Sequence, residues 1–190
     1  MTKEDKRVAL IRAATKLFSE RGFHGTPTAM ISKEAGVSSG ILFHYFPTKE
    51  DLINATYYAA KAQMMKGVTA GIDDEPTIEG KIRRMLSNSI RWSLANPQEF
   101  MFVEQFSSSP YITRITKEEL AKDNEFFYKL LKGYIREGKI REMDYGLLLY
   151  LVQGVIVAAV KKSLREGPDP DVDGIIDEVN RLIWGWISVK

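Results

Sequence analysis

Apolar residues recur along this chain at steps of three and four, the spacing that lines up one face of an α-helix. In the first such segment Leu10, Ala14, Leu17 and Phe18 follow this spacing, and Gly22 marks its end. No stretch shows the sustained alternation of apolar and polar residues that predicts a half-buried strand. The pattern therefore predicts an all-α protein.

Prolines, glycines and capping residues divide the chain into nine segments of helical length. Thr26-Pro27 is predicted to supply the N-cap and first position of the second helix, since Pro loses nothing where the N–H is unpaired anyway. Thr48–Asp51 and Thr116–Glu119 have the spacing of capping boxes, and Asp144 is placed to cap the eighth helix. The predicted helices cover about residues 4–20, 27–34, 39–45, 48–66, 77–95, 97–108, 116–138, 144–166 and 171–187.

The second and third helices are short and are joined by a turn that contains Gly36, which is the pattern of a helix-turn-helix. A small core is predicted between these helices, with Leu17 and Phe18 behind it. Its members are Ile31 and Ala35 on the second helix, Leu42, Tyr45 and Phe46 at the third, and Val37 between them. The other positions of the third helix are expected to point outward: Ser39, Gly40, Ile41, Phe43 and His44.

The run A-G-V-S-S-G-I-L-F-H-Y-F-P-T-K-E-D-L at residues 35–52, preceded by Gly22-Phe23 and Thr26, resembles the signature of TetR-family regulators. The resemblance implies a three-helix helix-turn-helix DNA-binding domain over 1–47 and a helical ligand-binding and dimerisation domain over 48–190. It further implies a transcriptional regulator, most simply a repressor that binds a palindromic operator as a homodimer. A small apolar or aromatic effector would release it from the double-stranded DNA.

In such proteins the third helix enters the major groove. Ser38 and Ser39 would meet a phosphate at the positive helix N-terminus, although a capping role alone also explains Ser38. Gly40 either lets the backbone approach the DNA or tolerates a tight first turn. Ile41 and His44 are outward and three apart, so we expect them at base edges, against a thymine methyl and through a hydrogen bond respectively.

Four further residues complete the predicted DNA-binding set. Thr26 matches a family position that meets phosphate, while its capping role needs no DNA. Tyr45 is expected to reach a phosphate with its hydroxyl, and Phe43 stands where Tyr is common in the family. Lys49 begins a helix, an unfavourable place for a cation, which is explained if its ammonium faces a phosphate. Because Ser39 replaces a common Lys, each half-site should bind modestly and depend on dimerisation.

Beyond the fourth helix only the family architecture carries over. Residues 92–128 are rich in aromatic side chains, which form either plain core or the wall of a small-molecule pocket. Glu104 lies among them and either faces a cationic ligand or solvent. The predicted ligand-binding residues are Trp92, Phe102, Glu104, Phe106, Phe127 and Gln153.

Residues 145–160 form a run of sixteen in which Gln153 is the one clearly polar side chain. A membrane span needs about 18 or more apolar residues, and Lys161-Lys162 end this run early, so burial against the protein and a partner is expected. The last helix has a broad apolar face at steps of three and four. The predicted dimer interface comprises Val155, Ile156, Ala159, Ile175, Val179, Leu182 and Trp186.

Composition changes this picture little. The net charge is +2, but residues 1–50 carry 8 Lys or Arg against 5 Asp or Glu, a basic bias that suits nucleic acid. There is no cysteine, which excludes disulfides and fits a cytoplasmic location. The N-terminal residues lack the uninterrupted apolar run of a secretory signal.

Two other functions stay open at this level. A small helical enzyme has little support, since the two histidines lie twenty residues apart and no catalytic, metal or cofactor motif occurs. No catalytic residue, metal site or cofactor is therefore predicted. A DNA-binding structural protein without a ligand is the other alternative.

Overall fold

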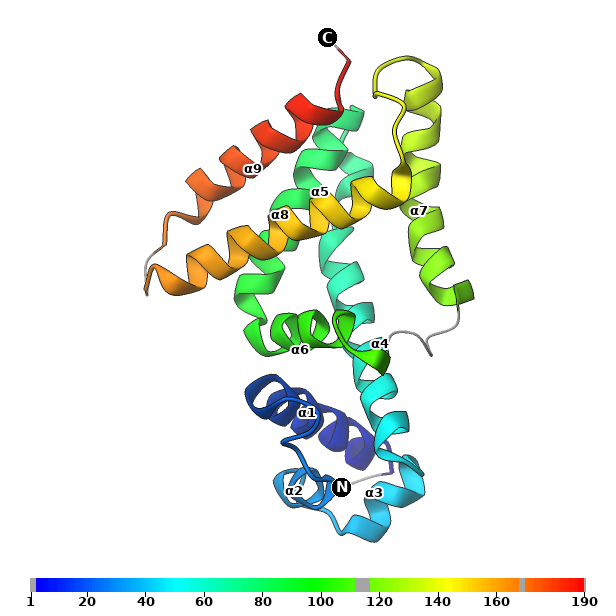
Figure 1. The fold of residues 1–190 in the computed structure, drawn as a ribbon, viewed down its shortest axis with the longest axis vertical. Coiled ribbons are helices and arrows are strands. Elements are labelled where there is room, and N and C mark those ends of the chain that lie inside the picture. Colours follow the sequence, from blue (N-terminus) through cyan, green and yellow to red (C-terminus); the bar gives the residue numbers. More distant parts are fainter. Residues whose placement is uncertain (1–2, 112–116, 168–169, 190) are drawn as a thin grey trace. The chain divides into compact units, whose positions relative to one another are not determined.

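The computed structural model describes residues 3–111, 117–167 and 170–189, which form nine α-helices and one short 3-10 helix (Figure 1). The predicted all-α fold is confirmed, and the predicted helix bounds agree with the observed ones to within two residues. The helices are α1 (Lys3–Arg21), α2 (Thr28–Glu34), α3 (Ser39–Tyr45), α4 (Lys49–Val68), η1 (Ile72–Asp74), α5 (Ile78–Ala95), α6 (Pro97–Ser107), α7 (Lys117–Arg136), α8 (Tyr145–Arg165) and α9 (Val172–Ile187).

The chain divides into two compact units. The first comprises the described residues within Met1–Gln63 and Asn96–Ile115, and the second those within Met64–Ala95 and Thr116–Lys190. Helix α4 runs from the first unit into the second. This division differs from the predicted boundary after residue 47, because α6 packs along α1 and so belongs with the helix-turn-helix.

The first unit has most of the small core that the apolar spacing predicts, while Ala35, Val37 and Tyr45 are half-buried at its edge. Phe18, Ile31 and Leu42 are fully buried, and Leu17 and Phe46 are nearly so. The turn between α2 and α3 depends on Gly36, whose φ of +67° lies in the left-handed region. That conformation costs a residue with a Cβ about 1–2 kcal/mol, so glycine is needed at this position.

The helix starts confirm one predicted cap and correct another. At α4, the Asp51 N–H donates to the Thr48 hydroxyl at 3.1 Å, and the Thr48 N–H donates to the Asp51 carboxylate at 3.0 Å. At α2 the N-cap is Pro27, not Thr26. The reason is that the Thr26 hydroxyl points back to α1 and donates to the Leu17 and Gly22 carbonyls at 3.2 and 2.8 Å. The predicted box at Thr116–Glu119 begins outside the described residues.

In the second unit α5 packs against both α8 and α9. The predicted cap Asp144 is confirmed, since its carboxylate accepts the Leu147 N–H at 2.7 Å. Asn180 on α9 donates to the Ser87 hydroxyl on α5 at 3.2 Å, and Asp173 forms an ion pair with Arg91. These polar contacts fix α9 on the outside of α5.

Helix α8 is long and apolar enough, by length and composition alone, to cross a membrane. The sequence run was expected to be too short, but the helix continues past Lys161-Lys162 to Arg165. Core helices of proteins without membrane segments have the same composition. In this single chain 22% of the apolar window is buried, so most of its apolar surface still needs a cover.

The turn glycine supplies a test of the fold. Replacing Gly36 by Ala should lower the free energy of unfolding by about 1–2 kcal/mol, because the left-handed backbone then meets a Cβ. The matched control is Gly40→Ala: Gly40 is helical, and a Cβ there would meet the Ser38 Oγ at 3.9 Å and nothing closer. Urea unfolding at one protein concentration measures both. Equal losses in the two variants would contradict this account.

Candidate nucleic-acid interface

Helix α3 presents a polar and aromatic surface on the side away from the core. Ser39, Gly40 and His44 are exposed, and the Phe43 side chain is 46% exposed. Ile41 and Tyr45 are half-buried at the edges of this surface. Leu42 and Phe46 hold the opposite face in the core. Four of the five residues predicted to point outward are exposed, and Ile41 is half-buried.

The start of α3 is fixed by two serines. The Ser38 hydroxyl accepts the Ile41 N–H at 3.3 Å, which confirms its capping role. The Ser39 hydroxyl lies 3.3 Å from the Ser32 hydroxyl of α2. The two helices are therefore joined by a side-chain contact beside the exposed N-terminus of α3.

Gly40 had two explanations, a tight first turn or a close approach of DNA. A Cβ at this position would have the Ser38 Oγ at 3.9 Å as its nearest neighbour, which is ordinary contact. Its φ is not positive either. Nothing inside the chain therefore requires glycine here, which favours a requirement from outside it.

Two residues with a predicted phosphate contact, Thr26 and Lys49, make contacts within the chain instead. Thr26 is fully buried, so its side chain has no surface to offer to DNA. The Lys49 ammonium donates to the Phe23 carbonyl at 2.5 Å and ties the start of α4 to the loop before α2. Burial lowers the pKa of Lys49. This bond gives an intrachain reason for a cation at a helix start, where the sequence analysis invoked a phosphate alone.

A cavity of about 480 Å³ in the first unit was not predicted. Arg7 of α1 lines it together with one face of α4, and the Arg7 guanidinium carbon lies 5.6 Å from the centroid of the Phe46 ring. The α4 residues are Asp51, Asn54, Ala55, Tyr58 and Ala59. The Arg7–Phe46 contact joins residues far apart in sequence, so no local pattern marks it.

The predicted ligand-binding residues fall into both units. Phe102, Glu104 and Phe106 belong to the first, where the two rings are fully buried in an aromatic core. Trp92, Phe127 and Gln153 belong to the second, and Gln153 is exposed on α8 rather than buried. Within the described ranges, no three His, Cys, Asp or Glu side chains gather closely enough to hold a metal ion.

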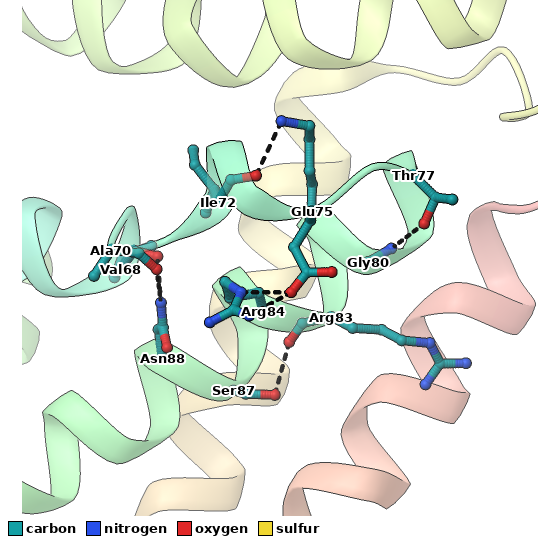
Figure 2. A network of polar contacts seen from close by, with 11 residues as sticks. Val68, Ala70, Ile72, Glu75, Thr77, Gly80, Arg83, Arg84, Ser87 and Asn88 are labelled. Atoms are coloured by element: carbon teal, nitrogen blue, oxygen red, sulfur yellow. Dashed lines mark hydrogen bonds and ion pairs between the residues drawn. The ribbon is translucent and has the colours of Figure 1, made fainter.

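The C-terminal end of α4 is bound tightly to α5 (Figure 2). The Asn88 amide donates to the Val68 and Ala70 carbonyls at 3.1 and 2.9 Å and so caps α4. Gly67 lies so close to Trp92 that a Cβ would stand 2.5 Å from the ring.

The segment that follows α4 is held on the same helix. The Lys81 ammonium donates to the Ile72 carbonyl at 2.9 Å, and Arg84 binds the Glu75 carboxylate at 2.6 Å. In consequence, the end of α4 and the segment after it are held against α5.

The predicted dimer residues differ in their exposure. Leu182 and Trp186 are 55% and 39% exposed. They lie four apart on one face of α9. Ala159 and Val179 are instead buried in their own unit, because they pack in the core of a single chain. Val155, Ile156 and Ile175 are half-buried, and α8 further exposes Leu147, Tyr150 and Leu151.

Comparison with known proteins agrees with this geometry. Residues 10–56 match the family model of bacterial regulatory proteins of the tetR family. The chain is 25% identical to the fatty acid metabolism regulator protein of Bacillus subtilis, over 99% of this chain and 98% of that one. It is 30% identical to the nucleoid occlusion factor SlmA of Haemophilus influenzae, over 86% and 78% of the two chains.

Solved structures have the same fold. A TetR family transcription regulator from Marinobacter aquaeolei superposes with a TM-score of 0.86 at 24% identity, over 98% of this chain and 97% of that chain. The regulator FadR of Bacillus subtilis, in complex with stearoyl-CoA, superposes with a TM-score of 0.76 at 22% identity, over 93% and 96%. The family model and the full-length relatives together mean that this chain belongs to the TetR family and is a DNA-binding transcriptional regulator.

Proposed function

We propose that the protein is a homodimeric repressor that binds a palindromic operator and is released by an apolar, acyl-chain effector. The proposal of DNA binding rests on the exposed face of α3. The opposite face of this helix is held in the core by the buried side chains of Leu42 and Phe46. We further propose that it has no catalytic activity and acts in the cytoplasm, as the relatives named as transcription regulators suggest.

The proposed contacts divide into two kinds. Ile41 and His44 meet base edges in the major groove, because a methyl contact and a hydrogen bond discriminate between bases. Ser38, Ser39 and Tyr45 meet phosphates and set the position of the helix. Phe43 packs against the backbone sugars, and Gly40 permits close approach of the α3 backbone. Lys49 keeps a supporting role, since an ammonium has three donors and the Phe23 carbonyl takes one.

The exposed apolar faces of α8 and α9 support dimerisation. Leu147, Tyr150 and Leu151 on α8, with Leu182 and Trp186 on α9, are exposed large apolar side chains, the kind of surface that marks an interaction site when it is contiguous. A second copy of the same faces would cover it with two-fold symmetry. The same burial accounts for the apolar character of α8 without a membrane.

The choice of effector class rests on the relative that is named a regulator of fatty acid metabolism and matches over the full length. A long acyl chain is an apolar ligand, as the sequence analysis predicted. In the proposed mechanism the effector displaces α5, and α4 follows because Asn88 and Trp92 hold its end. The α3 helices of a dimer would then no longer match two half-sites of one duplex.

A DNA-binding structural protein without a ligand is the second candidate, and the 30% identical nucleoid occlusion factor favours it. The two candidates differ in one measurable property. The repressor loses DNA affinity when an effector binds, whereas the structural protein does not.

The dimer is tested by changing an exposed interface residue. The wild-type protein should have a mass of about 43 kDa in light scattering, twice the 21.6 kDa of the chain. Leu182→Glu should give a folded monomer, because it would leave unpaired charges in the interface. Val179→Glu should unfold the chain, since Val179 is core. The control is Arg181→Glu, which places the new charge at the neighbouring exposed position. This variant should stay dimeric. A folded wild-type monomer would refute the proposed dimer.

Base recognition is tested on sites selected from random duplexes. His44→Ala should relax the preference at one or two base pairs of each half-site, with a loss of about 1–3 kcal/mol on the preferred sequence. His24→Ala removes the other exposed histidine, which lies outside α3, and should leave the selected sequence unchanged. If both variants select the same site as the wild type, His44 does not read a base.

Ligand response is tested by calorimetric titration with stearoyl-CoA, in the presence and absence of the selected operator. The operator should weaken stearoyl-CoA binding by about 5–150-fold, and stearoyl-CoA should weaken operator binding by the same factor. Coenzyme A without the acyl chain is the control and should have no effect on DNA binding. Equal stearoyl-CoA affinity in both titrations would reject this effector and favour the structural candidate.

A further inference from the structure

The recognition helix lacks the cations that DNA binding requires. Residues 38–46 contain no Lys or Arg, and the nearest one along the chain, Lys49, uses one of its three donors on the Phe23 carbonyl. Affinity for a duplex comes largely from cations that neutralise phosphates and release counterions. Basic residues of the other elements of the first unit are therefore further candidates for positive charge beside α3.

Arg7 of α1 is positioned to supply it. Its side chain is exposed, and its guanidinium lies over the Phe46 ring, with 5.6 Å from the guanidinium carbon to the centroid. Phe46 is itself 3% exposed and is the C-cap of α3, where its N–H donates to the Leu42 carbonyl at 2.8 Å. A buried ring thus lies within cation–π distance of Arg7 at the C-terminal end of the recognition helix.

The position of the Arg7 side chain also favours binding of an anion by its guanidinium. At 5.6 Å from the ring centroid the guanidinium is within the range of a cation–π contact, and its planar set of N–H donors matches the oxygens of a phosphate. Holding the side chain on Phe46 beforehand reduces the rotamer entropy lost on binding.

Asp51 is the acidic residue that lines the same cavity as Arg7. Its carboxylate accepts the Thr48 N–H and hydroxyl at 3.0 and 2.7 Å, so it is engaged in the cap of α4. No ion pair between Asp51 and Arg7 occurs in the described structure. The charge of Arg7 is therefore not neutralised by direct pairing with this carboxylate.

We propose that Arg7 binds a backbone phosphate beside the bases that α3 reads, with Phe46 as the platform that aligns it. The proposal rests on the DNA-binding function of the first unit. In this role Arg7 carries no sequence information and fixes the register of α3 in the groove. Recognition would then depend on α1 as well as on the helix-turn-helix itself.

The test is the salt dependence of operator binding by the full-length dimer. Arg7→Gln should reduce the slope of log K against log salt by about 0.9 for each half-site, and the affinity near 0.1 M salt by roughly tenfold per half-site. Arg7→Lys keeps the charge and should keep the slope. Arg12→Gln removes an exposed arginine from another face of α1, and should leave both slope and affinity close to those of the wild type.

The outcomes separate the possible failures. If the wild type binds no selected duplex, the DNA-binding function itself fails. If Arg7→Gln lowers affinity equally at every salt concentration, Arg7 acts by holding Phe46 and the phosphate contact is wrong. If Arg12→Gln reduces the slope as much as Arg7→Gln does, the effect is one of overall charge and the specific site is likewise rejected. Thermal unfolding of each variant shows whether the first unit is intact.

Discussion

Aromatic packing inside the first unit is the interaction on which the DNA-binding surface depends. Phe18 of α1, Phe23 of the following loop and Phe102 of α6 lie with ring centroids 5.3–6.0 Å apart. Tyr57 of α4 stacks on Phe106 at 4.1 Å. Rings at such distances combine large buried area with geometric preference. They join α1, α4 and α6 of the first unit through residues from distant parts of the chain.

Helix α4 is bound to the first unit in its first half and to the second unit at its last turn. Its first half is fixed in the first unit by the Tyr57 stack and by the Lys49 bond to the Phe23 carbonyl. Its last turn is fixed in the second unit by Asn88 and by the close packing of Gly67 on Trp92. One continuous helix therefore has attachments in both units, which is the feature that the proposed induction mechanism uses.

Helix α3 itself has no Lys or Arg side chain. Serines at its N-terminus and the backbone N–H groups there offer hydrogen bonds without a formal cation. A basic residue is supplied instead from α1, where the Phe46 ring orients Arg7. If Arg7 binds a phosphate as proposed, DNA affinity depends on α1 as well as on α3.

The sequence by itself determined the helices, the caps at Ser38, Thr48 and Asp144, and the outward residues of α3, because each follows from spacing within a few residues. Contacts between distant segments depend on tertiary structure, which local spacing does not encode. In the folded chain the Thr26 hydroxyl points back to α1, Lys49 donates to a distant carbonyl, and α6 belongs to the first unit. It also separated Val179 from Leu182, residues of one apolar helix, into core and surface. Helical periodicity shows which residues share a face, but only the packing of distant segments determines what that face meets.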